Sequence, residues 1–349
     1  MIKGRGAQTQ VKNRFLMHEY VQEHLEGIDE YDDGAPPTKY IPIFPKTIVN
    51  KVESPDVGME FSMNPYQGCE HGCIYCYARN SHEYWGYNAG LDFERVILYK
   101  ENAPALLEKY FQKPNYQPAT IVLSGNTDCY QPIERKLGIT RKLLEVFLKY
   151  KHPVGIITKN VLATRDADIL AALAKDNLAS IIFSITTMDE KVRRKLEPRT
   201  ATTQQKLRAI ETLSRLGVNC NIMIGPIIPG LNDHEIPNIM EAASKAGAKS
   251  ASFTMVRLNG QIGQVFEHWV ERAFPDRADK ILNQIKGAHN GKLNDSRFGA
   301  RMRGEGLMVE SIHQLFAVSK SKYFGNTHHR PPLRTDLFVK TNRGQMGLF

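Results

Sequence analysis

Three cysteines crowd into one short loop in the run Asn64-Pro65-Tyr66-Gln67-Gly68-Cys69-Glu70-His71-Gly72-Cys73-Ile74-Tyr75-Cys76-Tyr77-Ala78-Arg79. Cys69, Cys73 and Cys76 have the spacing CxxxCxxC, so this loop supplies three thiolates. A cubane 4Fe–4S cluster has four irons, and three protein ligands leave one iron free to bind something else. The loop therefore predicts a 4Fe–4S cluster with an open iron.

Two other uses of these cysteines fit the sequence poorly. A structural zinc site usually closes with four ligands and often uses paired CxxC units. His71 is the available fourth ligand, but it lies inside the same tight loop and would have to fold back to complete a tetrahedron. A disulfide is disfavoured because the chain has five cysteines, three of them in this loop, and no secretory signal.

Composition is that of an intracellular enzyme. The chain has 349 residues and is 42% hydrophobic, enough for one large α/β domain with appendages or for two domains. No apolar run approaches the roughly eighteen residues that a membrane span needs. Met1 to Met17 is basic and polar and has no apolar signal region. We therefore expect a cytoplasmic protein with no membrane partner.

The net charge of +9 is unevenly distributed. Between Lys292 and Arg343 the chain has ten Lys or Arg and four Asp or Glu. A basic segment of this kind is a common electrostatic footprint for nucleic acid. A solvated face on a basic protein explains the charge equally well, so charge alone leaves both interpretations open.

Strand and helix patterns alternate along the middle of the chain. Strands are expected at Ala119–Ser124, Val154–Thr158, Ser180–Ile185, Val218–Ile224 and Ser250–Val256, and helices at Thr140–Tyr150, Asp166–Ala174, Gln204–Leu216 and Ile236–Ala246. Such alternation implies a parallel sheet with βαβ crossovers. With a further strand before Cys69, roughly six βα units fit between residues 59 and 260. The alternation also suits a doubly wound sheet.

Motif strings narrow the choice. The cysteine spacing, with an aromatic residue just before Cys76, resembles the signature of the radical S-adenosylmethionine (radical SAM) superfamily. The strings PYQGCEHGCIYCYAR, SGNTDCYQPIE and LEPRT resemble the DNA repair photolyase-like group of that superfamily, which is related to spore photoproduct lyase. The likeness covers residues 40 to 260 and implies an α/β fold, the partial (β/α)6 TIM barrel of radical SAM enzymes. We expect an N-terminal extension (1–58), the barrel (59–260) and a C-terminal helical and basic segment (261–349).

The same resemblance implies cofactors and their ligands. Cys69, Cys73 and Cys76 would bind the 4Fe–4S cluster, and S-adenosylmethionine would be cleaved to a 5′-deoxyadenosyl radical with electrons from a reductase or a flavodoxin-type donor. Ligands of such barrels gather where the strands end. The expected contacts to S-adenosylmethionine are Tyr75, Ser124, Gly125, Asn126, Thr127, Asp128, Lys159, Ser184, Thr186, Glu197 and Arg199. Ser184 and Thr186 also read as ordinary strand residues, and Glu197 with Arg199 as a surface ion pair.

The sequence differs from the lyases in the residue that would donate a hydrogen atom. Those enzymes return a hydrogen atom from a cysteine after the second strand, whereas Ser124 to Thr127 contains no thiol. Spore photoproduct itself is therefore a poor candidate substrate, and nucleic acid stays open as a class. The candidate catalytic residues are Cys129, Tyr130 and Tyr77, chosen only for their position near the ligand edge.

The last residues suggest a partner. Gln345-Met346-Gly347-Leu348-Phe349 resembles the QLxLF peptide by which bacterial repair and replication proteins bind the sliding clamp, with Met in place of the consensus Leu. Leu348 and Phe349 would enter an apolar pocket while Gln345 forms hydrogen bonds. An ordinary disordered terminus is the alternative.

Together these features predict a radical SAM enzyme that acts on nucleic acid, with damaged DNA as the substrate that the resemblance implies. Two alternatives remain open. One is a radical SAM enzyme that modifies RNA, and the other is a cluster-bearing nucleic-acid-binding protein that performs no chemistry.

Overall fold

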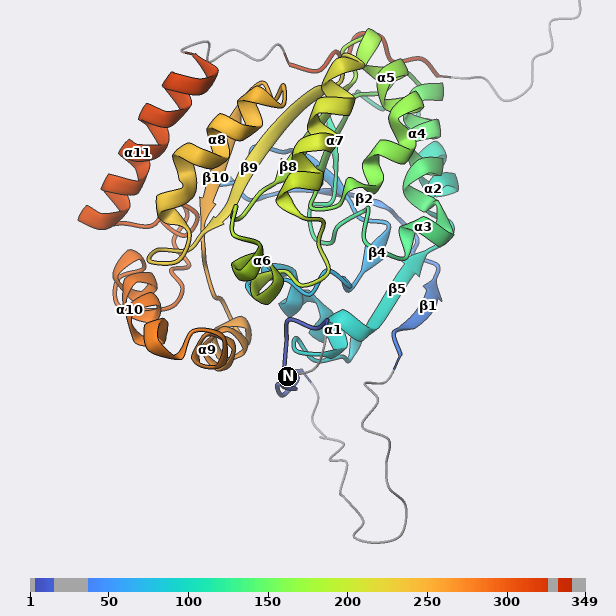
Figure 1. The fold of residues 1–349 in the computed structure, drawn as a ribbon. Coiled ribbons are helices and arrows are strands. Elements are labelled where there is room, and N and C mark those ends of the chain that lie inside the picture. Colours follow the sequence, from blue (N-terminus) through green and yellow to red (C-terminus); the bar gives the residue numbers. More distant parts are fainter. Residues whose placement is uncertain (1–3, 16–36, 326–331, 341–349) are drawn as a thin grey trace, which may run out of the picture.

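Six parallel strands form the centre of the molecule in the computed structural model, which describes residues 4–15, 37–325 and 332–340. In chain order they are β3 (Phe61–Met63), β6 (Ile121–Leu123), β7 (Val154–Thr158), β8 (Ala179–Ser184), β9 (Asn219–Ile227) and β10 (Ala251–Met255). Each strand pairs with the next one along the chain. A doubly wound sheet would reverse direction at a switch point, so the predicted partial barrel is confirmed (Figure 1).

The helices cover the outer face of this barrel (Figure 1). They are α2 (Ala103–Phe111), α3 (Glu134–Leu137), α4 (Ile139–Lys149), α5 (Ala167–Lys175), α6 (Glu190–Leu196), α7 (Thr203–Arg215) and α8 (Ile236–Lys245), with the 3-10 turns η2 (Val161–Asp166) and η3 (Asp233–Glu235) between them. Side chains alternate along each strand. On β8, Ile181 and Phe183 are buried in the core, whereas Ser180, Ile182 and Ser184 line an interior cavity.

A second, smaller sheet carries the cysteine loop. Its strand order is β1 (Lys39–Ile43), β5 (Val96–Lys100) and β4 (Tyr66–Gln67), and η1 (Tyr77–Trp85) and α1 (Asp92–Arg95) lie between β4 and β5. The part from β4 to β5, with η1 and α1, is inserted between barrel strands β3 and β6, whereas β1 precedes both barrel strands in the chain. A further strand, β2 (Val49–Lys51), pairs antiparallel with β3 at the edge of the barrel. The cysteines are thus held at the barrel rim by a sheet of their own.

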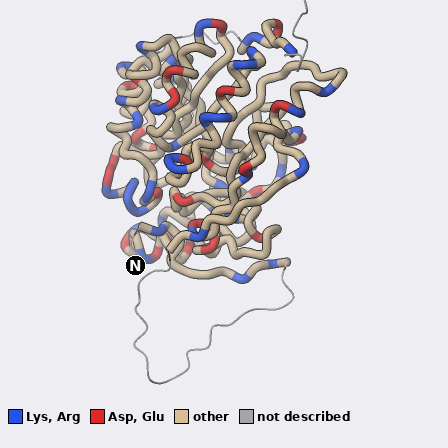
Figure 2. The backbone as a smooth tube through the Cα atoms, turned by 90° about the vertical axis from the view of Figure 1, so that its right-hand side faces the viewer, with Lys and Arg blue, Asp and Glu red and all other residues tan. Residues whose placement is uncertain are grey.

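The C-terminal part is helical. It comprises α9 (Ile262–Ala273), η4 (Pro275–Arg277), α10 (Ala278–Ala288) and α11 (Leu307–Phe324), of which α11 packs against α8. Figure 2 shows Lys and Arg interspersed with Asp and Glu over the side turned toward the viewer. Among the described residues, no helix is long and apolar enough to span a membrane. The proposed clamp-binding residues Gln345, Leu348 and Phe349 lie outside the described part of the chain.

Candidate active site

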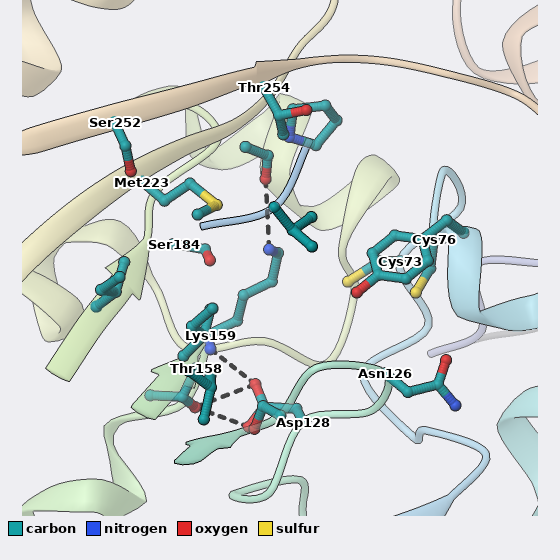
Figure 3. A pocket seen from close by; sticks show the side chains of 18 of the residues that line it. Cys73, Cys76, Asn126, Asp128, Thr158, Lys159, Ser184, Met223, Ser252 and Thr254 are labelled. Carbon is teal, nitrogen blue, oxygen red and sulfur yellow. Dashed lines mark hydrogen bonds between the residues drawn. The ribbon is translucent and has the colours of Figure 1, made fainter. Parts of the chain in front are cut away.

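A cavity of about 580 Å³ opens where the barrel strands end. Its lining comes from the cysteine loop, from the inner faces of β6 to β10 with the loops that follow these strands, from the segment between Asp56 and Met59, and from Met302. Figure 3 shows Lys159 and Asp128 across the cavity from Cys73 and Cys76. The loop predicted to hold a cluster and the strand ends predicted to hold a cofactor therefore face the same space.

The cysteines lie together at one wall of this cavity. Cys69, Cys73 and Cys76 all line it, and none of the three forms a disulfide. Burial is the largest influence on these thiols and raises the pKa of each one. Thiols in this setting become thiolates when a metal supplies positive charge, because metal binding displaces the proton.

The donor set fits a cluster better than a single ion. Among the described residues, no three His, Cys, Asp or Glu side chains converge as ligands of one metal ion. A cubane cluster needs no such convergence, since each cysteine binds a different iron. His71 does not complete a zinc tetrahedron: it is buried, and its Nδ1 lies 3.4 Å from Asp128 Oδ2.

Asp128 connects the loop after β6 with β7 and with the cysteine loop. Its carboxylate accepts hydrogen bonds from Thr158 Oγ1 at 2.8 Å and from the backbone N–H of Lys159 at 2.7 Å, both at the end of β7. It also accepts the backbone N–H of Tyr130 at 2.8 Å, in its own loop. Together with the contact to His71, these bonds fix the loop after β6 against both β7 and the cysteine loop.

Lys159 and Ser184 are polar groups at the cavity wall. The Lys159 Nζ lies 3.4 Å from the carbonyl oxygen of Gly225 and 5.9 Å from the ring centroid of Tyr75 (Figure 3). Burial alone would lower the pKa of Lys159, but nearby acidic groups, Glu197 foremost, outweigh it and raise that pKa. Ser184 ends β8, and within the described residues its hydroxyl has no hydrogen-bond partner. Both side chains are available to a ligand.

The loop after β6 is shaped by close contacts. Ser124 adopts a positive φ of 79°, and its hydroxyl accepts the backbone N–H of Cys129 at 2.8 Å. Gly125 has room for no side chain, because an added Cβ would lie 2.9 Å from the Cβ of Ser62. Asn64 accepts the backbone N–H groups of Asn126 and Thr127 at 2.8 and 3.1 Å. The side chains of Ser124, Asn126 and Thr127 line the cavity.

Behind the cysteine loop lies a buried network centred on Glu197. Tyr75 donates to Glu197 Oε1 at 2.5 Å, and its hydroxyl lies 3.3 Å from Thr186 Oγ1. Lys206 Nζ lies 3.6 Å from Glu197 Oε2, and both side chains are at most 1% exposed. Burial opposes ionisation of Glu197, yet the charges of Lys206 and Lys159 lower its pKa to about 2. The carboxylate is therefore a charged anchor for Tyr75.

Four predicted ligands lie outside the cavity lining: Gly125, Thr186, Glu197 and Arg199. Arg199 Nη1 lies 3.3 Å from Glu70 Oε1, and its backbone N–H donates to the carbonyl of His71. Glu197 is fully buried and pairs with Lys206, so it does not form the surface ion pair with Arg199 that the sequence left open. The LEPRT turn thus contacts the cysteine loop on the side away from the cavity and helps to hold it in place.

The three predicted catalytic residues divide into two groups. Cys129 and Tyr130 are fully buried in the core, and neither reaches the cavity, because Tyr130 donates to Asp166 Oδ2 at 3.1 Å and the Cys129 side chain packs among apolar residues. Burial raises the pKa of both. Tyr77 lines the cavity, is 46% exposed, and donates to the carbonyl of Gly125.

A cover of N-terminal residues closes the outer side of the cysteine loop. Glu94 accepts the backbone N–H groups of Gly6 at 3.0 Å and Ala7 at 2.8 Å. It also pairs with Arg79 at 2.6 Å, and both side chains are fully buried. Arg79 in turn donates to the carbonyl of Cys73 at 3.0 Å. This network links residues 4–15, here called the N-terminal cover, to the cysteine loop.

Two features of the site were missed by sequence reasoning. Arg257 lines the cavity two residues after the end of β10, and Asp56 lines it from the segment before β3. Arg257 could have been found, because it follows the sixth strand just as Lys159 follows the third. Asp56 has no such signal, since residues 52–58 show no periodicity.

Known proteins resemble this chain in sequence and fold. The family described as "Radical SAM superfamily" matches residues 63–243. An uncharacterized protein of Mycobacterium tuberculosis is 30% identical over 234 residues, which cover 66% of this chain and 69% of the relative. An uncharacterized protein of Methanocaldococcus jannaschii is 28% identical over 244 residues, covering 70% and 87%. A mutant spore photoproduct lyase with bound AdoMet and dinucleoside spore photoproduct has a similar fold, with a TM-score of 0.59 and 16% identity over 82% of this chain and 80% of that one.

Proposed function

This chain belongs to the radical SAM superfamily, and from that premise we propose that it is an enzyme that removes a hydrogen atom from nucleic acid, with damaged DNA as its substrate. The observation that carries the proposal is the cavity itself. Its three cysteines face the polar ends of the barrel strands across one enclosed space. A cofactor and a substrate can therefore meet there without crossing solvent.

The residues present suit the family's cofactors. Cys69, Cys73 and Cys76 would hold a 4Fe–4S cluster. When bound and supplied with an electron by a reductase or flavodoxin-type donor, cluster and S-adenosylmethionine provide a 5′-deoxyadenosyl radical that abstracts hydrogen. The Lys159 ammonium can pair with the methionine carboxylate, and the Ser184 hydroxyl can bind the ribose. Tyr75, held by Glu197, offers a fixed aromatic ring to the adenine.

Two observations support nucleic acid as the substrate class. The fold neighbour with bound AdoMet also holds a dinucleoside lesion in its structure. In the present chain an exposed tyrosine and an arginine, Tyr77 and Arg257, stand at the cavity, and aromatic rings with cations are the usual elements of single-strand binding. Because Cys129 is buried in the core, the hydrogen donor of the lyases has no counterpart among the three predicted catalytic residues, which favours a different outcome after hydrogen abstraction.

The test is release of 5′-deoxyadenosine by anaerobically reconstituted, reduced protein. We expect release to increase with ultraviolet-irradiated single-stranded DNA over intact DNA. Stimulation by RNA alone would favour the RNA-modifying alternative. No release from protein with a full complement of iron would support the non-catalytic alternative and overturn the proposal.

Cysteine variants make this assay specific. Replacement of Cys69, Cys73 or Cys76 by Ala should abolish bound iron and 5′-deoxyadenosine release. Cys220→Ala is the matched control, because Cys220 is fully buried in the core on β9 and does not line the cavity. It should retain iron near four atoms per chain. Loss of iron in the control as well would show that the effect is structural.

The C-terminal peptide is a separate proposal. Gln345, Leu348 and Phe349 would recruit the enzyme to a sliding clamp during replication or repair. A synthetic peptide of about the last fifteen residues should bind a purified bacterial clamp and lose binding when Leu348 and Phe349 become Ala. Equal, negligible binding of both peptides would refute it.

A further inference from the structure

Arg257 is a partly buried cation without a carboxylate of its own. It lines the cavity two residues after the end of β10, and its guanidinium carbon lies 5.5 Å from the ring centroid of Tyr77. Within the described residues its side chain has no hydrogen bond or ion pair, and the charges that act on it belong to Arg301, Asp56 and Tyr77. Its planar donors are therefore free toward the cavity.

The nearest acid is already occupied. Asp56 accepts the backbone N–H of Gly299 at 2.7 Å and the Nε–H of Arg301. Arg301 also donates to Ser54 Oγ at 2.5 Å. Arg257, Arg301 and Asp56 thus carry a net charge of +1 at the cavity. Burial and the neighbouring Arg301 lower the pKa of Arg257, because an unpaired cation is disfavoured in a partly buried position.

The anion that suits this position is a phosphate. A guanidinium presents a rigid fork of donors that matches phosphate and carboxylate oxygens. In the proposed function the carboxylate of S-adenosylmethionine pairs with Lys159, which lies beside Tyr75 and Gly225. Arg257 instead rests on Tyr77, whose ring is 46% exposed. This is the rim of the cavity, where a polymer backbone can stay outside while one nucleotide enters.

We propose that Arg257 binds the phosphodiester next to the nucleotide that enters the cavity, with its guanidinium plane supported by the ring of Tyr77. The inference rests on the proposed function and adds a substrate-positioning residue to it. A duplex is too wide to enter a cavity of about 580 Å³ that would also hold the cofactor. Single-stranded or extruded nucleotides are accordingly the form that Arg257 would select.

The test compares Arg257→Gln with a control of equal charge change. Arg297 lies on the nearby loop, is 56% exposed, and pairs with Asp295 and Glu305, so Arg297→Gln removes a cation that is already neutralised. Binding of a fluorescein-labelled single-stranded DNA 12-mer to reconstituted protein would be measured by anisotropy at several salt concentrations. S-adenosylmethionine binding would be measured separately by calorimetry.

Arg257→Gln should weaken DNA binding about tenfold, as expected for loss of one charged hydrogen-bonded contact. The slope of log K against log salt should fall by about 0.7, the value for one phosphate on a single strand. Arg257→Lys should restore the slope and only part of the affinity, because a lysine keeps the charge and loses the fork. Arg297→Gln should change neither quantity by more than about twofold.

The other possible outcomes decide between Arg257, the cofactor and the substrate class. Unchanged DNA binding in Arg257→Gln, with a parent protein that does bind DNA, overturns the assignment of Arg257 and leaves the proposed function intact. Weakened S-adenosylmethionine binding with unchanged DNA binding assigns Arg257 to the cofactor carboxylate and also overturns it. A parent that binds neither DNA nor RNA refutes the proposed substrate class, and the assignment with it. Tighter binding of RNA, weakened in the same way by Arg257→Gln, supports the assignment on the other polymer.

Discussion

Replacing Glu197 by Gln removes a charge from the interior while keeping the size of the side chain. Lys206 is 1% exposed and lies 3.6 Å from this carboxylate. In the variant the ammonium loses the carboxylate that offsets its burial, whereas Tyr75 can still donate to the amide oxygen. The destabilisation is therefore electrostatic, and packing changes little.

The size of the effect follows from burial. Removing one partner of a buried ion pair costs about 3–5 kcal/mol. The entropy of unfolding is about 2.1 cal/mol/K per residue, or about 0.7 kcal/mol/K for 349 residues. The expected fall in the midpoint of thermal unfolding is thus about 4–7 °C. Glu241→Gln, which breaks an exposed pair with Lys245, should give no measurable shift.

Thermal unfolding followed by circular dichroism under anaerobic conditions measures both variants. The double variant Glu197→Gln/Lys206→Met, which removes both charges, should recover at least half of the loss. A shift below about 2 °C in Glu197→Gln, or a double variant no more stable than the single one, would refute the reasoning that Lys206 depends on this carboxylate.

Two further predictions concern pH and oxygen. Burial lowers the pKa of His152 to about 3. Between pH 6.5 and about 3 the unfolded chain therefore binds a proton that the folded chain does not. The free energy of unfolding should accordingly fall by up to about 1.4 kcal/mol per pH unit on acidification. His152→Phe should flatten the decline in urea midpoint between pH 6.5 and 4.5 relative to exposed His268→Gln; an unchanged slope would contradict this. An added Cβ on Gly6 would lie 1.7 Å from the carbonyl oxygen of Gly72 and overlap it. The variant Gly6→Ala should therefore displace the N-terminal cover and shorten the lifetime of the reconstituted cluster in air. The visible absorbance of the cluster measures this lifetime. Gly287→Ala, where nothing lies within 4 Å, should match the parent, and equal lifetimes in both variants would argue against a protective cover.

The barrel could be predicted because its signals are local and repeated. Each strand from β6 to β10 is an apolar run followed by a helix of strong amphipathic pattern, so a few residues of error in a boundary do not change the order of units. The sheet that holds the cysteine loop could not be predicted. Its strands β1, β4 and β5 have two to five residues each. Their partners lie more than thirty positions away for β4 with β5 and more than fifty for β1 with β5, which leaves no periodicity to detect.

The site was predictable where a residue's place on a strand determines its direction. Ser184 ends β8 and Lys159 directly follows β7, and both reach the cavity. Cys129 and Tyr130 follow Ser124, whose positive φ turns the loop, and both lie buried in the core outside the cavity lining. A catalytic role for either residue stays a prediction. The burial of Glu197 is explained by its ion pair with Lys206, a buried lysine on the following helix. Amphipathic periodicity does not indicate that a lysine points inward.

The N-terminal cover has a consequence for how the protein is made. Gly6 and Ala7 bind Glu94, and Gly6 contacts Gly72, so the N-terminal cover has no binding site until about ninety further residues have been synthesised. The cysteine loop is consequently synthesised before the N-terminal cover can bind over it. Delivery of iron and sulfide to the nascent chain would meet three accessible thiols, whereas delivery to the finished protein must pass through the mouth of the barrel.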